Sequence, residues 1–329
     1  MVTINDVAKH AGVSRGTVSN VINNVKVRPE YKEKVERAIA ELGYVPNAYA
    51  RSLKSNRTYT IALILPTVWF PFFSKLTNDM EQELRRRGYK MLLCNSQNDY
   101  QMELEYVTMA KENKVDGILA ITYSDIAPYV VNSNIPMVAI ERYFSERIPF
   151  VSTDNFQGGQ MAAEKLLELG CSRLAFVGRL SDPNGVTKLR RDGFVSFCRE
   201  RGILYTELYS MSDSQRFIGE IDDFARREYQ DRIPWDGVFA ATDRYAEYMI
   251  DALREHGSPA VAGETLQIIG FDGIQSHANE RIRISSMRQP VEAIAAHAVD
   301  SLCKLIAGEE AERYKLFPVT FISGKTTRL

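Results

Sequence analysis

The first 23 residues contain the pattern that most restricts what this chain can form. They predict two short helices joined by a tight turn. Thr3 is placed to cap the first helix, and Asp6 completes a capping box three residues later. Gly12 lies where the chain must turn, because glycine turns without steric cost. Ser14 is placed to cap the second helix.

The second helix of this pair has an apolar side and a polar side. The side that faces the first helix comprises Val18, Val21 and Ile22. The opposite side offers short polar groups with a guanidinium at its N-terminal end: Arg15, Gly16, Ser19 and Asn20. Such a helix suits the DNA major groove, where arginine and short polar side chains read base edges. The alternative is a small amphipathic helical hairpin with no role in DNA binding.

Charge is divided unevenly along the chain. Residues 1–58 contain ten Lys or Arg and five Asp or Glu, which gives a net charge of +5. The rest of the chain contains 31 Lys or Arg and 37 Asp or Glu, which gives a net charge of −6. A basic head on an acidic body is typical of a nucleic-acid-binding module attached to another domain. The asymmetry therefore favours the DNA-binding interpretation of the helical pair.

A third helix closes the head. Pro29 suits the first turn of a helix that runs to about Leu42, and Gly43 is placed to end it. These three helices predict a small all-α domain that ends near residue 46.

The segment after the head has a helical composition but is too short to hold a helix alone in water. We therefore expect residues 47–56 to fold on contact with a partner. Leu53 would be an unexplained exposed apolar residue in a plain linker. Beside DNA it could wedge between base steps in the minor groove.

From residue 60 onward, short apolar runs alternate with amphipathic helical stretches. Uninterrupted apolar strands between helices indicate parallel sheets that are covered on both faces. The length of 329 residues allows two or more domains. We therefore predict an α/β protein: an all-α head followed by two doubly wound parallel-sheet subdomains. The predicted strands are 61–65, 91–94, 117–121, 137–140, 150–152, 174–177, 204–205, 237–241, 266–270 and one near 316–322. The predicted helices are 74–87, 101–113, 158–169, 187–201, 215–228, 243–256 and 290–307.

Side chains suited to a polyhydroxylated ligand follow several of these strands. Ligands bind at the carboxyl ends of the strands in such sheets. Aromatic faces stack on sugar rings, and acids share hydrogen bonds with hydroxyls. The aromatic candidates are Trp69, Phe70, Phe72 and Phe73, for which core packing is the alternative. The charged candidates are Glu141, Arg142, Asp154, Asp243 and Asp272. Helix capping is the favoured interpretation of Asp154 and Asp243, and it explains Asp272 less easily.

The sequence does not indicate a disulfide, a metal site, a membrane span or a complete phosphate-binding loop. The four cysteines are scattered and indicate reduced packing residues, and the four scattered histidines predict no metal site. No run approaches the ~18 apolar residues that span a bilayer, and the N-terminus does not resemble a signal peptide. We therefore expect a cytoplasmic protein without a cofactor, a metal or a membrane contact. The segment Ser323-Gly-Lys-Thr326 resembles part of a phosphate-binding loop, but Val319 replaces its first glycine.

The chain resembles the LacI/GalR family of bacterial transcription regulators over nearly all of its length. The motifs that carry the resemblance are Thr3-Ile-Asn-Asp-Val-Ala-Lys9, Gly12-Val-Ser-Arg-Gly-Thr-Val-Ser19, Leu42-Gly-Tyr-Val-Pro-Asn-Ala-Tyr-Ala-Arg-Ser-Leu53 and Ile268-Ile-Gly-Phe-Asp272. The resemblance implies a homodimer that binds a near-palindromic operator in double-stranded DNA. It also implies a small effector, often a sugar, bound in a body like that of type I periplasmic binding proteins.

The resemblance assigns roles to residues of the head and the following segment. Base reading would fall to Arg15, Gly16 and Asn20. Phosphate contacts would fall to Thr17, Ser19, Asn23 and Tyr44, and minor-groove contacts to Ala50, Leu53 and Lys54. Gly16 departs from the family, because many relatives have a longer side chain there. Arg15 and Asn20 would then do most of the direct reading, with guanine and adenine as favoured partners.

The resemblance also places effector contacts in the body. They fall on Phe73, Glu141, Arg190, Asp243 and Asp272, and Arg190 begins the motif Arg190-x-x-Gly-Phe194. Trp69, Phe70 and Arg142 complete the expected effector-binding set. Glu141 stands where Asp is commoner in the family, and Thr242 stands where Asn is common. The expected domains are a head at 1–46, a hinge at 47–58, an N-terminal subdomain at 59–156 with 289–317, and a C-terminal subdomain at 157–288 with 318–329.

The leading prediction is a DNA-binding repressor controlled by a sugar-like effector, without enzymatic activity. A co-repressor, or a phosphoprotein partner in place of a small molecule, is a variant of this prediction. A solute-binding protein of a transporter would share the two-lobed body but would lack the basic head. A sugar hydrolase would use two of the cleft carboxylates as acid and base.

Overall fold

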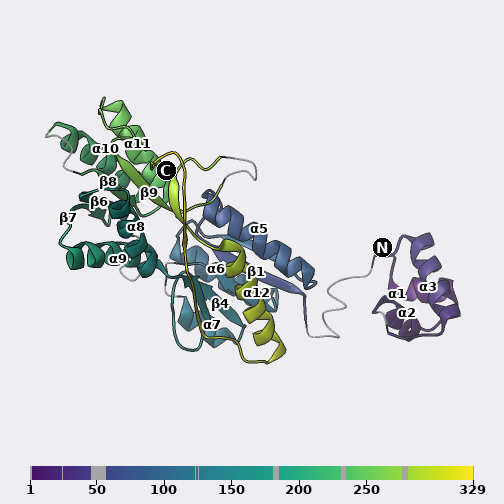
Figure 1. The fold of residues 1–329 in the computed structure, drawn as a ribbon. Coiled ribbons are helices and arrows are strands. Elements are labelled where there is room, and N and C mark those ends of the chain that lie inside the picture. The colour runs from purple at the N-terminus through teal and green to yellow at the C-terminus, as the bar shows by residue number, and fades with distance from the viewer. Residues whose placement is uncertain are drawn as a thin grey trace. The chain divides into compact units, whose positions relative to one another are not determined.

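Three helices pack around a small apolar core at the start of the chain. The computed structural model describes residues 2–23, 25–45, 57–122, 124, 126–180, 185–230, 235–275 and 281–328. The chain divides into two units, Met1–Tyr59 and Thr60–Leu329. The first unit contains α1 (Ile4–Ala11), α2 (Arg15–Ile22) and α3 (Pro29–Leu42) (Figure 1). Val7, Val18 and Val35, one from each helix, are fully buried against one another.

The helices of the head begin and end at the predicted signals. Thr3 and Asp6 form a capping box, in which each side chain accepts a hydrogen bond from the backbone amide of the other. The Ser14 hydroxyl accepts a hydrogen bond from the amide of Thr17 at 3.1 Å. Gly12 and Gly43 end α1 and α3 in the left-handed conformation. These caps confirm the predicted helix-turn-helix and third helix. The minor-groove candidates Ala50, Leu53 and Lys54 lie outside the described residues.

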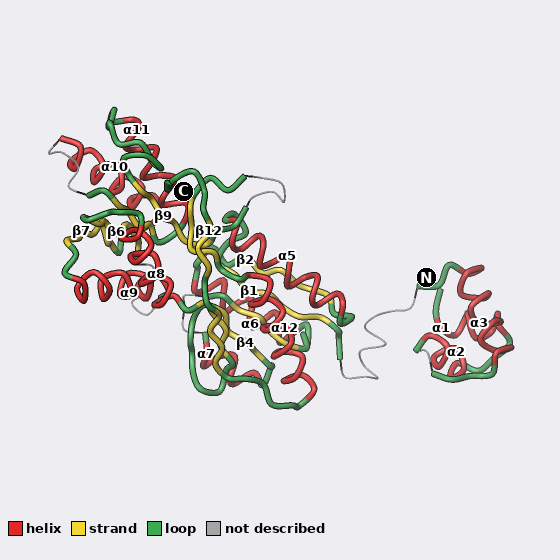
Figure 2. The backbone as a smooth tube through the Cα atoms, in the orientation of Figure 1, coloured by secondary structure: helices red, strands yellow, loops and turns green. Residues whose placement is uncertain are grey.

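Two six-stranded sheets form the second unit (Figure 2). The strand order is β11-β5-β4-β3-β1-β2 in the first sheet and β12-β10-β9-β8-β6-β7 in the second. Neighbouring strands are parallel, except that β12 is antiparallel to β10. The first sheet comprises β1 (Thr60–Leu65), β2 (Lys90–Asn95), β3 (Gly117–Ala120), β4 (Met137–Ile140), β5 (Phe150–Thr153) and β11 (Tyr314–Phe317). The second comprises β6 (Arg173–Arg179), β7 (Leu204–Ser210), β8 (Gly237–Ala240), β9 (Gln267–Asp272), β10 (Ser285–Arg288) and β12 (Thr320–Ile322). The predicted α/β fold with two doubly wound sheets is thereby confirmed.

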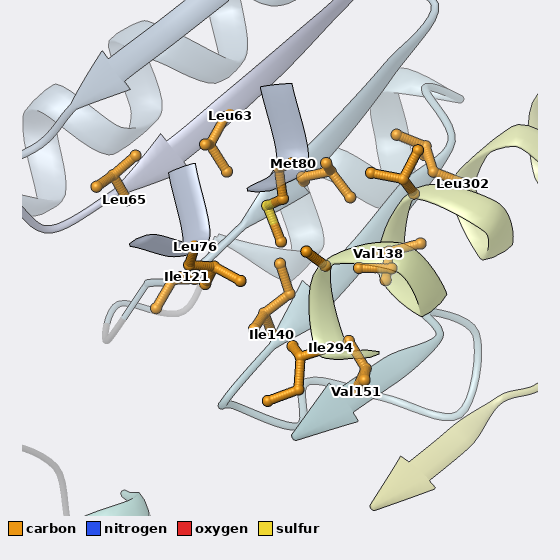
Figure 3. Close-up of a cluster of buried hydrophobic side chains, with 14 of the residues drawn as sticks. Leu63, Leu65, Leu76, Met80, Ile121, Val138, Ile140, Val151, Ile294 and Leu302 are labelled. Carbon is orange, nitrogen blue, oxygen red and sulfur yellow. The ribbon is translucent and has the colours of Figure 1, made fainter. Parts of the chain in front are cut away.

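Helices cover both faces of the first sheet, because successive side chains of a strand point to opposite faces. Leu63 of β1 packs on the face covered by α5 (Pro71–Arg86) and α12 (Val291–Ala307). Figure 3 shows side chains of these two helices, among them Met80 and Leu302, meeting the strands there. Ile64, the next residue of β1, packs on the other face, which is covered by α6 (Tyr100–Glu112) and α7 (Ala127–Ser133).

The second sheet repeats this arrangement. Phe176 of β6 packs on the face covered by α8 (Asn155–Glu168) and α9 (Val186–Arg201). Val177 packs on the opposite face, which is covered by α10 (Ser214–Gln230) and α11 (Asp243–Glu255). Each sheet with its four helices therefore has an apolar core of its own, and we refer to the two assemblies as the first lobe and the second lobe.

The chain passes between the lobes three times, after β5, after β10 and after β11. The first and second of these crossings are joined by a hydrogen bond of 2.6 Å from the Thr153 hydroxyl to Oε1 of Gln289. The first and third are joined by a hydrogen bond of 2.8 Å from the amide of Asp154 to the carbonyl of Phe317. The three crossings are therefore held together at one place between the lobes.

The structure differs from the sequence prediction at three elements. The single strand predicted near 316–322 is two strands, β11 and β12, one in each sheet. Pro318 lies between them and cannot donate a backbone hydrogen bond to a ladder. The sequence did not predict β10, because this strand contains Ser285 and Ser286 at positions where a buried strand usually has branched apolar residues. It did not predict α7 because this helix has seven residues, too few for a clear amphipathic pattern, and because valine has a low helix propensity.

Helices α8 and α9 approach each other closely at two glycines. A Cβ atom at Gly159 would lie 2.0 Å from the carbonyl oxygen of Arg190, and one at Gly193 would lie 2.0 Å from that of Phe156. Protein interiors are close-packed, so neither position accepts a larger residue unless a helix moves. The two glycines therefore fix α9, which carries Arg190, against α8.

Replacing Gly159 by alanine tests this packing. We expect Gly159→Ala to lower the free energy of unfolding by about 1–3 kcal/mol through overpacking. Gly219 is an exposed glycine of α10 whose added Cβ would meet no atom within 4 Å. We expect the matched control Gly219→Ala to raise stability by about 0.5–1 kcal/mol. Urea unfolding of the two variants measures both effects, and equal stability changes would contradict the close approach of the helices.

Candidate functional site

A cavity of about 430 Å³ is lined by residues that follow strands of both sheets. Residues 66–73 follow β1, Glu141 follows β4, Thr242 follows β8 and Asp272 ends β9. The carboxyl ends of strands are where open α/β sheets bind ligands. The volume lies in the range of small-molecule sites, so this cavity is the candidate site of the body.

Seven of the eight expected effector-binding residues line this cavity: Trp69, Phe70, Phe73, Glu141, Arg190, Asp243 and Asp272. The eighth, Arg142, is not among the lining residues. Its guanidinium lies 5.4 Å from the centroid of the Phe144 ring. The side chains that the sequence predicted at separate strand ends are therefore brought together, with one exception.

The aromatic candidates divide between the apolar core and the opening of the cavity. Phe72 is buried in the core of the first lobe, and Phe73 packs partly against that core. Trp69 is 85% exposed and Phe70 is 40% exposed. Core packing is therefore correct for Phe72, whereas Trp69 and Phe70 are exposed side chains that line the cavity.

Arg190 is a cation that is only 3% exposed. Its Nε donates a hydrogen bond of 2.8 Å to Oδ1 of Asn155, and its Nη1 donates one of 2.7 Å to the carbonyl of Ala241. Its guanidinium carbon lies 3.7 Å from the centroid of the Phe271 ring, close enough for a cation–π interaction. These contacts from α8, β9 and the end of β8 hold the guanidinium in one orientation.

Two carboxylates lie beside this guanidinium at ion-pair distance, but beyond hydrogen-bond distance. Oε2 of Glu141 is 3.8 Å from Nη2 of Arg190, and Oδ1 of Asp272 is 3.7 Å from Nη1. The Ser152 hydroxyl donates to Glu141 at 2.9 Å, and Nε2 of Gln289 donates to Asp272 at 2.8 Å. Both carboxylates retain oxygen lone pairs for ligand hydroxyls, because each oxygen can accept two hydrogen bonds.

The backbone at both carboxylates adopts conformations that favour glycine. The φ angle is +65° at Glu141 and +113° at Asp272. A side chain in such a conformation costs on the order of 1–3 kcal/mol, and such residues cluster at ligand sites. The strain sets where each carboxylate points relative to Arg190.

Asp243 does not cap α11, contrary to the favoured interpretation of the sequence. Thr242 is the cap residue, and its hydroxyl accepts a hydrogen bond from the amide of Tyr245 at 3.3 Å. The Asp243 carboxylate instead accepts hydrogen bonds from the amide of Gly273 at 2.8 Å and from the Ser286 hydroxyl at 2.6 Å. The sequence interpretation was wrong because the residue before Asp243 supplies an equally good cap.

Two other sequence features have structural roles. Asp154 caps α8, as predicted, by accepting a hydrogen bond from the amide of Gln157 at 2.9 Å. The segment that resembled a phosphate-binding loop lies along β9. There the Thr326 hydroxyl donates to the carbonyl of Ile268 at 2.7 Å, and the amide of Ile268 donates to the carbonyl of Thr326 at 2.8 Å.

Burial raises the pKa of three of the carboxyl groups that line the cavity, those of Glu141, Asp243 and Asp272. The pKa of Asp243 lies well above its usual value, and the charge of Asp272 raises it further. The pKa of Asp272 is raised to about 6, against the opposing effect of Arg190. Burial also raises the pKa of Glu141, while Arg190 and the Ser152 hydroxyl oppose the shift. Burial therefore makes all three groups easier to protonate than exposed carboxyl groups.

The predicted DNA-reading residues occupy one helix of the head. Arg15 and Gly16 are exposed in the first turn of α2, and Asn20 is half-buried. Gly16 has no side chain to screen the Arg15 guanidinium. The expected phosphate contacts are half-buried or exposed: Thr17, Ser19, Asn23 and Tyr44. Asn23 is ordered by a hydrogen bond of 2.7 Å from its Nδ2 to the carbonyl of Ser19.

The sequence did not single out the residues that hold the charged groups in place. Asn155 orients Arg190, Gln289 joins Thr153 to Asp272, and Ser286 holds Asp243. A polar residue directly after the strand end was a visible signal for Asn155. Gln289 and Ser286 gave none, because β10 was not predicted.

Within the parts of the chain that the structure describes, no helix is both long enough and apolar enough to cross a membrane. The same residues contain no cluster of three or more His, Cys, Asp or Glu side chains that could hold a metal ion.

Comparison with known proteins agrees with both parts of the structure. Residues 3–47 match the bacterial regulatory proteins of the lacI family, and residues 163–327 match the periplasmic binding protein-like domain. The ribose operon repressor of Halalkalibacterium halodurans is 34% identical over 100% of this chain and 98% of its own. The sucrose operon repressor of Streptococcus mutans is 33% identical over 98% of each chain.

Two solved structures share the fold. The lac repressor dimer bound to operator and the anti-inducer ONPF is 23% identical with a TM-score of 0.85, covering 100% of this chain and 99% of that one. The complex of the transcriptional regulator CelR with cellobiose is 27% identical with a TM-score of 0.69, covering 99% of this chain and 100% of that one. A basic helix-turn-helix head joined to a two-lobed binding body defines a ligand-responsive DNA-binding regulator. This chain belongs to the lacI family of bacterial regulatory proteins.

The raised pKa of Asp272 predicts how pH affects the body without a ligand. Between pH 4 and 6 the folded state binds a proton that the unfolded chain has released, so stability is lost as pH rises through about 6. We expect the wild type to lose about 1 kcal/mol more stability than Asp272→Asn between pH 5 and 8. Urea unfolding measures this difference, with Asp251→Asn, an exposed residue of α11, as control. If the free energy of unfolding has the same pH dependence in the wild type and in Asp272→Asn, the raised pKa of Asp272 is contradicted.

Proposed function

We propose that this chain is a transcriptional repressor whose operator affinity is controlled by a sugar or sugar derivative bound in the cavity between the lobes. The observation that carries the proposal is the buried Arg190 with three carboxyl groups around the same cavity. Alternating donors and acceptors match the hydroxyls of a sugar, and the exposed faces of Trp69 and Phe70 match its ring. Relatives that are named repressors of sugar operons support the same ligand class.

The proposal includes no catalytic step. The cavity carboxyl groups are engaged by Ser152, Ser286 and Gln289 and by the amide of Gly273. Such fixed hydrogen bonds suit recognition of hydroxyl groups more than proton transfer to a scissile bond. As a DNA-binding repressor, the protein would act in the cytoplasm, and as a dimer it would place two heads on a near-palindromic site.

The crossings between the lobes connect the cavity to the arrangement of the two lobes. Asp272 contacts the ligand in this proposal and is hydrogen-bonded to Gln289, which is hydrogen-bonded to Thr153. A ligand whose hydroxyls bind Asp272 would therefore change the hydrogen bonds that join the two lobes at Gln289 and Thr153. For coupling, the ligand must favour one arrangement of the lobes over the other.

A direct measurement of coupling tests the proposal. Operator sites are first selected from random double-stranded DNA, and affinity is then measured with and without D-ribose, sucrose, cellobiose, D-xylulose, D-ribose 5-phosphate, D-glucose 6-phosphate and D-gluconate. We expect at least one sugar to change operator affinity about tenfold or more, a typical coupling between sites. A decrease identifies an inducer, and an increase identifies a co-repressor. Unchanged affinity across the panel would contradict control by a sugar.

Trp69 provides an independent readout of sugar binding. The chain has two tryptophans, and Trp235 is 3% exposed and stacked on Phe224. A sugar that enters the cavity should change the emission of exposed Trp69 and leave that of Trp235 unaltered. We expect Trp69→Phe to abolish the signal, with sugar binding then followed by calorimetry. A signal that survives in Trp69→Phe would place binding elsewhere.

Arg15 tests direct reading of DNA by the head. We expect Arg15→Ala to lose about 1–3 kcal/mol of specific binding and to relax the preference at one base position. Arg37, an exposed arginine of α3 paired with Glu33, is the charge-matched control. Binding-site selection with Arg15→Ala and Arg37→Ala measures the difference. An equal loss on every DNA sequence would make Arg15 a phosphate contact instead.

A further inference from the structure

The cavity has a second set of charged residues, which the sugar contacts described above do not use. Four arginines from the second lobe line it: Arg179, Arg244, Arg281 and Arg283. Arg179 ends β6, Arg244 is the second residue of α11, and the other two precede β10. They are half-buried or exposed, whereas Arg190 is buried. The second lobe therefore adds a positively charged wall to the cavity, apart from the buried guanidinium.

Arg179 has unused hydrogen-bonding capacity in this wall. Its Nη1 donates to the carbonyl of Ser212 at 3.4 Å, a long and weak hydrogen bond. Its Nε is buried and, among the described residues, has no hydrogen-bond partner. A buried donor without a partner is rare and costly in a folded protein. A guanidinium has five N–H donors in a planar fork that matches a carboxylate or phosphate. The Arg179 guanidinium therefore has donors available for an anionic group of a ligand.

The neighbouring residues add donors and little opposing charge. Val186 and Thr187, the first two residues of α9, line the same cavity, and α9 has no side-chain cap. Their amides lie at the positive end of the helix dipole. Within the described ranges, Arg179, Arg244 and Arg281 have no carboxylate at ion-pair distance. Glu247 is the acidic residue that lines this outer part.

Arg244 also joins the wall to the aromatic opening. Its guanidinium lies 5.3 Å from the centroid of the Phe70 ring, and its Nε donates to the Tyr248 hydroxyl at 2.7 Å. Phe70 belongs to the first lobe and Arg244 to the second. A ligand that reaches from the carboxyl groups to Phe70 therefore passes from hydrogen-bond acceptors to Arg244, a cation with no carboxylate at ion-pair distance among the described residues.

We infer that the effector is an anionic sugar, one that carries a phosphate or carboxylate group. Its hydroxyls bind Asp243, Asp272 and Glu141, and its anionic group binds Arg179 and the adjoining arginines. This inference rests on the proposed function and names the class of sugar. A neutral sugar would leave the charges of Arg179, Arg244 and Arg281 without an anionic partner, whereas a phosphate or carboxylate group supplies one.

The experiment compares charged sugars with their neutral parents on the full chain. Binding is followed by calorimetry for D-ribose, D-ribose 5-phosphate, D-glucose, D-glucose 6-phosphate, D-gluconate and inorganic phosphate. We expect a charged sugar to bind about tenfold or more tightly than its neutral parent, because charge-assisted hydrogen bonds are roughly twice as strong as neutral ones. Comparison of the phosphorylated sugars with D-gluconate identifies the anionic group.

Variants connect the preference to the arginine wall. We expect Arg179→Gln to remove most of the preference for the charged sugar and to change the affinity for its neutral parent less than about threefold. Arg281→Gln is a second variant in the same wall. Arg254→Gln, an exposed residue of α11 outside the cavity, is the control that retains the preference. Urea unfolding with a midpoint close to that of the wild type shows that the body of each variant is folded.

Each outcome supports or overturns the inference. Tighter binding of neutral sugars, or a preference for charged sugars that Arg179→Gln and Arg281→Gln both retain, would overturn it and leave the proposed function intact. Binding of inorganic phosphate alone, without a sugar, would overturn it by making the wall a general anion site. If no sugar in the panel binds to a wild type that binds its operator, the inference and the proposed function fail together.

Discussion

The ion pairing around Arg190 is the interaction on which the candidate site depends. A buried guanidinium is stable only when hydrogen bonds and opposite charges surround it. Asn155 and Ala241 accept hydrogen bonds from Arg190, and the Phe271 ring makes a cation–π contact with it. Glu141 and Asp272 supply the opposite charges. Because Glu141 follows a strand of the first lobe and Asp272 ends a strand of the second, this one cation is attracted to both lobes. Opening or closing of the cavity therefore changes the electrostatic environment of Arg190 directly.

The carboxyl groups show how burial and charge combine in such a site. Burial raises each pKa, and the nearby cation limits the rise at Glu141 and Asp272, whereas at Asp243 a neighbouring carboxylate adds to it. The three groups thus differ in their readiness to accept or donate a hydrogen bond, although their chemistry is similar. A ligand with several hydroxyls can then be bound in one orientation.

Much of this arrangement could be predicted from the sequence, and the exceptions have physical causes. The caps at Thr3 and Ser14 are local, so the head could be predicted residue by residue. Residues that follow apolar strands, such as Glu141 and Asp272, could be placed because parallel strands bring their carboxyl ends to one edge. Gln289 and Arg179 could not be predicted as part of the site. Their roles arise from contacts between segments more than 100 residues apart or from the shape of the cavity, and neither leaves a local pattern.

The three crossings between the lobes also determine how the parts of this protein can be exchanged. Residues 2–45 are contiguous and have a core of their own, so the head can be joined to another body as one gene segment. Neither lobe is contiguous, because β11 and α12 return to the first lobe and β12 completes the second. Recombination at a single point would therefore leave both sheets incomplete. DNA specificity can be transferred between such regulators by one exchange, whereas ligand specificity must change by substitution within an intact body.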